Sequence, residues 1–202
     1  YAVRVLKAGT DAGADVLCLC DTNGGFLPHE VSRIISELPA ESLAPIGGHF
    51  HNDCGTAVAN SLAAIEAGAR HIQGTINGWG ERCGNANLCV VIPNVVIKMG
   101  YEPSCAPNLR HLTNLSRFVA EKANIIPDKR QPYVGTAAFS HKAGQHADVL
   151  AKAETLMEHI DSSLVGNERQ ILLSELAGKS TVVDKLSKYG EFGKNDDVVK
   201  HL

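Results

Sequence analysis

The stretch Ala44-Pro-Ile-Gly-Gly-His-Phe-His-Asn-Asp53 decides the fold of this chain. It opens with an apolar run without alternation, as in a parallel strand covered on both faces, and we predict a buried strand over Ala44–His51. Side chains alternate between the two faces of a strand, so His49 and His51 project from one face and Phe50 from the other. Two imidazoles on one rigid face could hold a divalent ion. The alternative is two unrelated polar residues at a strand end.

Strand and helix patterns alternate on both sides of this stretch. The predicted helices cover residues 2–14, a segment that begins near Pro28, and residues near 55–68 and 86–98. The predicted flanking strands cover Val16–Cys20 and His71–Ile76. Pro93 should bend the last helix or delay its regular start. This alternation predicts an α/β fold of right-handed β-α units around a parallel sheet.

Polar side chains follow each predicted strand. They are Asp21 and Thr22 after the first strand, residues 49–53 after the second and residues 77–85 after the third. In an α/β barrel, the carboxyl ends of the strands form the catalytic face. About three β-α units cannot close an eight-stranded barrel. The chain is therefore either an open sheet or the back part of a barrel whose front half lies elsewhere.

The pattern changes after Gly100, so we predict two parts, residues 1–100 and 101–202. The second part is expected to be mostly helical, with helices near 108–123, 137–152 and 175–189 and an extended Pro132–Gly135. The first of these helices should turn four apolar side chains inward: Leu112, Leu115, Phe118 and Val119. The second carries His141 and His146 on different faces. This part could reach a neighbouring subunit.

The composition is that of a globular protein long enough for a sizeable core: 202 residues, 44% of them hydrophobic, with a formal charge of -3 and a pI near 6.3. The 22 acidic and 19 basic residues nearly balance and form no basic run, so nucleic-acid binding has little support. No apolar stretch reaches the roughly 18 residues of a membrane span, and no signal-peptide pattern opens the chain. We expect a cytoplasmic protein without a membrane partner.

The six cysteines fit that compartment. None forms a Cys-x-x-Cys pair, and a chain of this size has little need of a disulfide framework, so we expect reduced thiols. Cys18 and Cys20 share one face of a predicted strand. We interpret both as small core residues in preference to metal ligands. The full set is Cys18, Cys20, Cys54, Cys83, Cys89 and Cys105.

Ordered motifs run through nearly the whole chain. They are Leu19-Cys-Asp-Thr22, His49-Phe-His-Asn-Asp53, Ala57-Val-Ala-Asn-Ser-Leu62, Thr75-Ile-Asn-Gly78, Gly80-Glu-Arg-Cys-Gly-Asn85 and Ala143-Gly-Gln-His-Ala147. Together they closely resemble the isopropylmalate, homocitrate and citramalate synthase family, and their agreement in order is more specific than any single motif. The stretches 83–88, 164–167 and 174–178 are most similar to the citramalate synthase branch. The resemblance implies the C-terminal portion of a TIM (β/α)8 barrel, followed by post-barrel subdomains.

The resemblance also implies an activity. The family joins acetyl-CoA, as co-substrate, to a 2-oxo acid by a Claisen-type condensation and then hydrolyses the thioester. Pyruvate, giving citramalate for isoleucine synthesis, is the first expectation. The alternative is 2-oxoisovalerate, giving isopropylmalate for leucine synthesis. Two further alternatives are a related acyl-CoA lyase, against which the 143–147 motif argues, and a non-catalytic metal-binding or dimerisation module.

Site residues carried over from the family fall on matching positions. His49, His51 and Asn85 would be ligands of a zinc, manganese or magnesium ion that polarises the carbonyl of the 2-oxo acid. Thr22 would bind the substrate carboxylate, although it could instead only stabilise a turn. Glu81 would also bind substrate, unless it pairs with Arg82 in the loop. His146 would assist proton transfer at the acetyl-CoA end, often from a partner subunit, although an exposed helix histidine is the alternative.

The chain also departs from the family. The family's first strand carries an Arg-Asp pair, of which the Asp is a metal ligand, and a later strand carries an acidic residue. None of these precedes Asp21 here. We therefore expect the 202 residues to be a fragment of a homodimeric enzyme and to be inactive on their own.

Overall fold

The computed structural model describes residues 1–142, 158–172, 183, 186, 190 and 196. The chain divides into two compact units. One comprises Tyr1–Leu109 with Asn114–Ile125, and the other comprises Arg110–Thr113 with Ile126–Leu202. The boundary near residue 100 stays a prediction. No helix among the described residues is long and apolar enough to cross a membrane.

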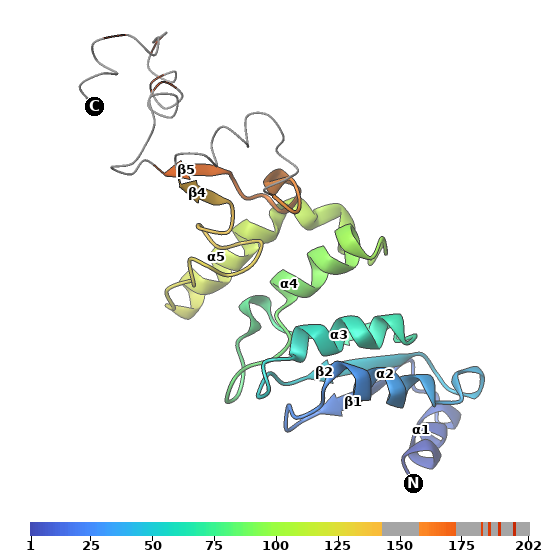
Figure 1. Ribbon diagram of the computed structural model, residues 1–202. Helices are drawn as coiled ribbons and strands as arrows, with labels where there is room; N and C mark the ends of the chain where they lie inside the picture. Colours follow the sequence, from blue (N-terminus) through green and yellow to red (C-terminus); the bar gives the residue numbers. More distant parts are fainter. Residues whose placement is uncertain (143–157, 173–182, 184–185, 187–189, 191–195, 197–202) are drawn as a thin grey trace. The chain divides into compact units, whose positions relative to one another are not determined.

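The first unit is built on a parallel sheet. Its strands β1 (Leu17–Asp21), β2 (Ile46–Phe50) and β3 (His71–Gln73) lie in the order β1-β2-β3. Figure 1 labels β1 and β2. They alternate with the helices α1 (Ala2–Asp11), α2 (Pro28–Ser36), α3 (Ala57–Glu66) and α4 (Leu88–Pro93). The β-α alternation predicted from the sequence is confirmed. Because the strands are parallel, their three carboxyl ends lie at one edge of the sheet.

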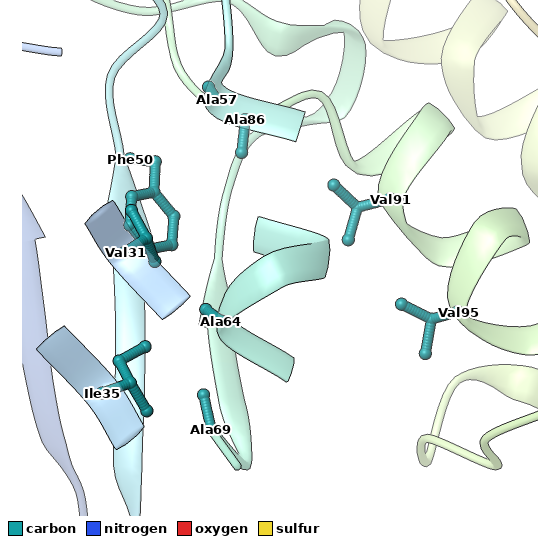
Figure 2. Close-up of a cluster of buried hydrophobic side chains, with 9 residues drawn as sticks. All are labelled: Val31, Ile35, Phe50, Ala57, Ala64, Ala69, Ala86, Val91 and Val95. Carbon is teal, nitrogen blue, oxygen red and sulfur yellow. The ribbon is translucent and has the colours of Figure 1, made fainter. Parts of the chain in front are cut away.

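The core of this unit lies between the sheet and its helices. Phe50 of β2 is only 4% exposed and belongs to a cluster of buried apolar side chains from α2, α3, α4 and the segments beside these helices (Figure 2). Ala57 and Ala64 of α3 are fully buried in it, and such small side chains let a helix approach a sheet closely. The cluster consists of Val31, Ile35, Phe50, Ala57, Ala64, Ala69, Ala86, Val91 and Val95.

Two predicted elements of this unit differ in extent. β3 ends at Gln73 rather than at Ile76, and the chain passes into a 3-10 turn at Ile76–Gly78. The last predicted helix changes character at Pro93, after which Asn94–Lys98 forms a π-helix. Pro93 has no amide hydrogen for the helical ladder, so a change of hydrogen bonding beside it is expected.

Two burial predictions were wrong. Cys20 is exposed and Cys18 is half-buried, so neither thiol is a fully buried core residue. In α5 (Leu112–Ala123), Leu115 and Phe118 are 42% and 55% exposed, although both were predicted to face inward. Leu112 is buried as predicted and Val119 is half-buried, and the rest of the buried face of α5 carries the small or polar residues Thr113, Ser116 and Ala120. Polar groups on that face are invisible to a search for apolar periodicity.

The second unit contains a short parallel pair, β4 (Ser140–Lys142) and β5 (Gln170–Leu172). The helix predicted from residue 137 is therefore wrong up to residue 142, and its remainder lies outside the described residues. The predicted extended Pro132–Gly135 is a series of turns in which Tyr133 has φ +66°. Of the helix predicted at 175–189, only residues 183 and 186 are described, and both are helical.

A buried carboxylate joins strand β4 to the start of β5 within the second unit. Arg169 donates to both oxygens of Glu158, with Nε–Oε1 and Nη2–Oε2 distances of 2.7 and 2.8 Å. His141 Nε2 lies 3.0 Å from Glu158 Oε1, and the Glu158 side chain is 4% exposed. Hydrogen bonds from Arg169, and then from His141, lower the pKa of Glu158 below its usual range.

We predict that Phe50→Ala lowers the free energy of unfolding of the full-length protein by about 3–5 kcal/mol, because it empties a well-packed site. Phe118→Ala is the matched control, since this ring is largely exposed and a surface change is usually worth within about 0.5 kcal/mol. Urea denaturation at neutral pH measures both. Equal losses for the two variants would contradict the core assignment.

We also predict that Glu158 makes stability depend on pH. Its pKa is lowered in the folded state, so its contribution is present above the unfolded pKa and is lost as pH falls through the folded pKa. Glu158→Gln should lower the free energy of unfolding by about 1–3 kcal/mol at pH 7, because it leaves partly buried donors poorly paired, and progressively less in acid. Glu37→Gln, in an exposed i,i+4 pair with Arg33, is the control. A penalty for Glu158→Gln that does not change with pH would refute the assignment.

Candidate active site

Two histidines lie at the carboxyl end of β2. The ring centroids of His49 and His51 are 5.2 Å apart, with an angle of 65° between the ring planes. The predicted pairing of these side chains on one face is thus confirmed, with Phe50 in the core on the other face. His51 is buried, and its Nδ1 has no hydrogen-bond partner. A buried ring nitrogen without a partner is costly unless a ligand completes it.

The loop after β3 brings Asn85 to this pair. The Asn85 amide Nδ2 lies 3.2 Å from His49 Nε2, and Asn85 forms an antiparallel bridge with His51. A Cβ at position 80 would overlap Asn85 Oδ1, so the glycine at that position leaves room for this amide where it lies. Turning the amide by a half-rotation presents its oxygen to the same point.

The spacing of His49 and Asn85 suits two ligands of one divalent ion, and the ring of His51 lies beside that of His49. Two ligands about 2.1 Å from an ion and at right angles to each other lie about 3 Å apart, which matches the separation of His49 and Asn85. Imidazole nitrogen and amide oxygen are both common ligands of such ions. No three His, Cys, Asp or Glu side chains in the described part of the chain converge on one point. An ion bound here would therefore need further ligands besides these three side chains.

The loop after β1 is shaped by Asp21. Its buried carboxylate accepts hydrogen bonds from the backbone amides of Gly25 and Phe26, each at 3.2 Å. His51 N donates to Asp21 O at 3.3 Å, which places Thr22 beside the end of β2. Thr22 is exposed and lines a concave surface at this edge of the sheet. That surface is formed by Cys20, Asp21, Thr22, Asn23, Phe26, Asp53 and Arg82.

Arg82 joins these loops through a pairing that the sequence analysis missed. Its Nε and Nη2 donate to the two Asp53 carboxylate oxygens at 2.8 and 3.1 Å, and Nη2 also donates to Thr22 O at 2.7 Å. The guanidinium lowers the pKa of Asp53. Glu81 was expected to bind substrate or to pair with Arg82. Its Oε2 lies 3.7 Å from Arg82 Nη1, and its side chain is 83% exposed. No local spacing connects Arg82 with Asp53, which lies 29 residues earlier.

The remaining predicted site residue cannot be placed. His146 lies outside the described residues, so its catalytic role stays a prediction. His141 is engaged with Glu158 in the second unit.

Comparison with known proteins agrees with the motifs. The family model described as HMGL-like matches residues 1–119, and the one described as homocitrate synthase post-HMGL domain-like matches residues 133–201. The (R)-citramalate synthase of Aquifex aeolicus is 51% identical over 94% of this chain and 36% of its own length. That of Sulfolobus acidocaldarius is 49% identical over 100% of the chain and 39% of its length. The 2-isopropylmalate synthase of Methanocaldococcus jannaschii is 40% identical over 100% of this chain and 40% of its own length.

Solved structures show the same barrel architecture. An HMG-CoA lyase from Acinetobacter baumannii, in complex with coenzyme A and 3-methylmalate, matches with a TM-score of 0.51 and 26% identity over 64% of this chain and 44% of its own. The N-terminal domain of a putative aldolase from Bacteroides vulgatus matches with a TM-score of 0.51 and 27% identity, over 62% of this chain and 42% of its own. The three-stranded sheet with its helices is thus part of a TIM barrel.

The chain spans a little over a third of the length of the curated relatives that it matches. The match over residues 1–119 includes all three strands of the sheet, with His49 in β2, and the positions of His51 and Asn85. The chain therefore belongs to the HMGL-like family, in the group of the citramalate, isopropylmalate and homocitrate synthases.

Proposed function

We propose that the full-length protein condenses acetyl-CoA with pyruvate to form citramalate. The observation that carries the proposal is the grouping of His49, His51 and Asn85 at the carboxyl ends of β2 and β3, in a chain 51% identical to a citramalate synthase. The product would serve isoleucine synthesis. The protein would act as a cytoplasmic homodimer.

In this reaction a carbon–carbon bond forms between the methyl carbon of acetyl-CoA and the carbonyl carbon of the 2-oxo acid. The methyl proton passes to a base, the carbonyl oxygen becomes a hydroxyl, and water then cleaves the thioester to free CoA. A divalent ion held by His49, His51 and Asn85 would supply Lewis-acid chemistry at the 2-oxo acid.

The residues of this chain would bind and orient the reactants. His49 and His51 would each offer one ring nitrogen to the ion. The Thr22 hydroxyl donates a hydrogen bond to the substrate carboxylate from the edge of the same sheet. Glu81 remains a candidate substrate contact, and His146 assists proton transfer at the acetyl-CoA end.

The runner-up is a 2-isopropylmalate synthase, which the 40% identity to the Methanocaldococcus jannaschii enzyme supports. Selectivity between pyruvate and 2-oxoisovalerate depends on the apolar contacts around the substrate side chain. One methylene is worth only about 1–3 kcal/mol in such a pocket. A few substitutions therefore decide between the two activities.

We predict that the full-length protein releases CoA thiol from acetyl-CoA faster with pyruvate than with 2-oxoisovalerate, and only with a divalent metal present. A thiol-reactive dye measures the release. A preference for 2-oxoisovalerate would favour isopropylmalate synthesis. No release with any 2-oxo acid would refute the synthase proposal, and cleavage of a hydroxyacyl-CoA would then indicate a lyase. The 202 residues alone should release none.

We further predict that His49→Ala and His51→Ala each weaken binding of Mn²⁺ or Zn²⁺ to the full-length protein by at least about tenfold, because each removes a ligand. Isothermal titration measures the affinity without reference to turnover. His29→Ala, an exposed histidine on α2, is the control. Unchanged metal affinity in both site variants would remove the histidine pair from the metal centre.

A further inference from the structure

Arg82 makes contacts that span all three strand ends. It belongs to the loop after β3, its guanidinium holds the carboxylate of Asp53 after β2, and it donates to the carbonyl of Thr22 after β1. A planar guanidinium offers several donors in a fixed geometry, so one side chain can satisfy both partners at once.

The backbone at Arg82 is held in an uncommon conformation. Its φ is +52°, in the left-handed region that residues with a side chain rarely adopt. Such a conformation persists only where its surroundings enforce it, and it concentrates at functional sites. Here it coincides with the fork of hydrogen bonds to Asp53 and Thr22.

The three loops also meet through main-chain hydrogen bonds. Asn52 N donates to Gly84 O at 2.9 Å, and Cys54 N donates to Gly24 O at 3.0 Å. A Cβ at Gly24 would lie 2.8 Å from Asp53 N, so the first two loops are in close contact. Arg82 thus adds side-chain hydrogen bonds to three loops that are already held together by main-chain hydrogen bonds.

We propose that Arg82 is a positioning residue that holds the proposed substrate contact Thr22 in register with the histidines and Asn85. This inference rests on the proposed function for its catalytic consequence. The guanidinium neither binds the ion nor reacts. It sets the distance between the group that holds the 2-oxo acid's carboxylate and the groups that hold its carbonyl end.

The test compares four variants of the full-length protein. Arg82→Gln removes the charge, Arg82→Lys keeps the charge but loses the fork, and Asp53→Asn weakens the partner. We call the hydrogen bonds from Arg82 to Asp53 and Thr22 the clamp. Arg82→Gly removes the side chain while favouring the positive φ, so it tests the clamp separately from the backbone conformation. Arg33→Gln, at an exposed arginine paired with Glu37 on α2, is the matched control.

We expect Arg82→Gln, Arg82→Gly and Asp53→Asn to lower kcat/KM for the 2-oxo acid by about 10- to 100-fold, since displacements near 1 Å cost this much. KM for acetyl-CoA should change less than about twofold, because the clamp orients the other substrate. Arg82→Lys should recover only part of the loss. The Arg82→Gln and Asp53→Asn effects should not add, because both break one contact.

Hydrogen exchange provides a readout that needs no activity. In Arg82→Gln, the amides of Asn52 and Cys54 should exchange faster than in the parent protein, while amides within α3 stay unchanged. If the parent protein releases no CoA, the proposed function fails and this exchange result alone decides whether the clamp exists. Unchanged exchange would overturn the clamp. Faster exchange together with unchanged kinetics for the 2-oxo acid, or equal losses for both substrates, would overturn its positioning role.

Discussion

The alternation of side chains along β2 is the constraint on which the rest of this molecule depends. Phe50 turns into the helix-covered core, while His49 and His51 turn to the opposite face. One strand therefore builds the hydrophobic centre and presents the proposed metal ligands. A slip of one residue in its register would exchange the two faces, exposing the ring of Phe50 and burying imidazoles among apolar side chains. Core packing and the proposed site are thus specified together.

Much of the first unit could be predicted from the sequence because its signals are local. Apolar runs separated by helical periodicity gave the three strands and their helices, and the parallel arrangement placed the polar residues at one edge. The buried face of α5 was harder to predict than the helix itself, because the polar residue Ser116 is buried through hydrogen bonds. Its Oγ donates to Asn77 Oδ1 at 2.6 Å, and Asn77 Nδ2 donates to Ser116 O at 3.0 Å. Such a pairing between distant residues leaves no periodic trace.

The second unit was predicted less well for a related reason. Strands β4 and β5 are each three residues long, too short to show an alternation that differs from a helical pattern. They are linked through the buried carboxylate of Glu158, which His141 and Arg169 contact from separate segments of the chain. In the candidate site, the histidine pair followed from the strand period and Asn85 from the family resemblance. The pairing of Arg82 with Asp53 needed the folded structure.

The junction of the three loops relies strongly on main-chain atoms: the carbonyls of Thr22, Gly24 and Gly84 are the acceptors. A carbonyl is present whatever side chain its residue carries. In evolution, the main-chain contacts that hold the loops can therefore be kept while side chains on the neighbouring surface change. A lineage can exchange the residues of the concave surface other than Asp21, Asp53 and Arg82, and with them the compounds it accepts, while the spacing of the strand ends passes on unchanged. Enzymes of differing specificity can then descend from one ancestor by few steps, each of them folded.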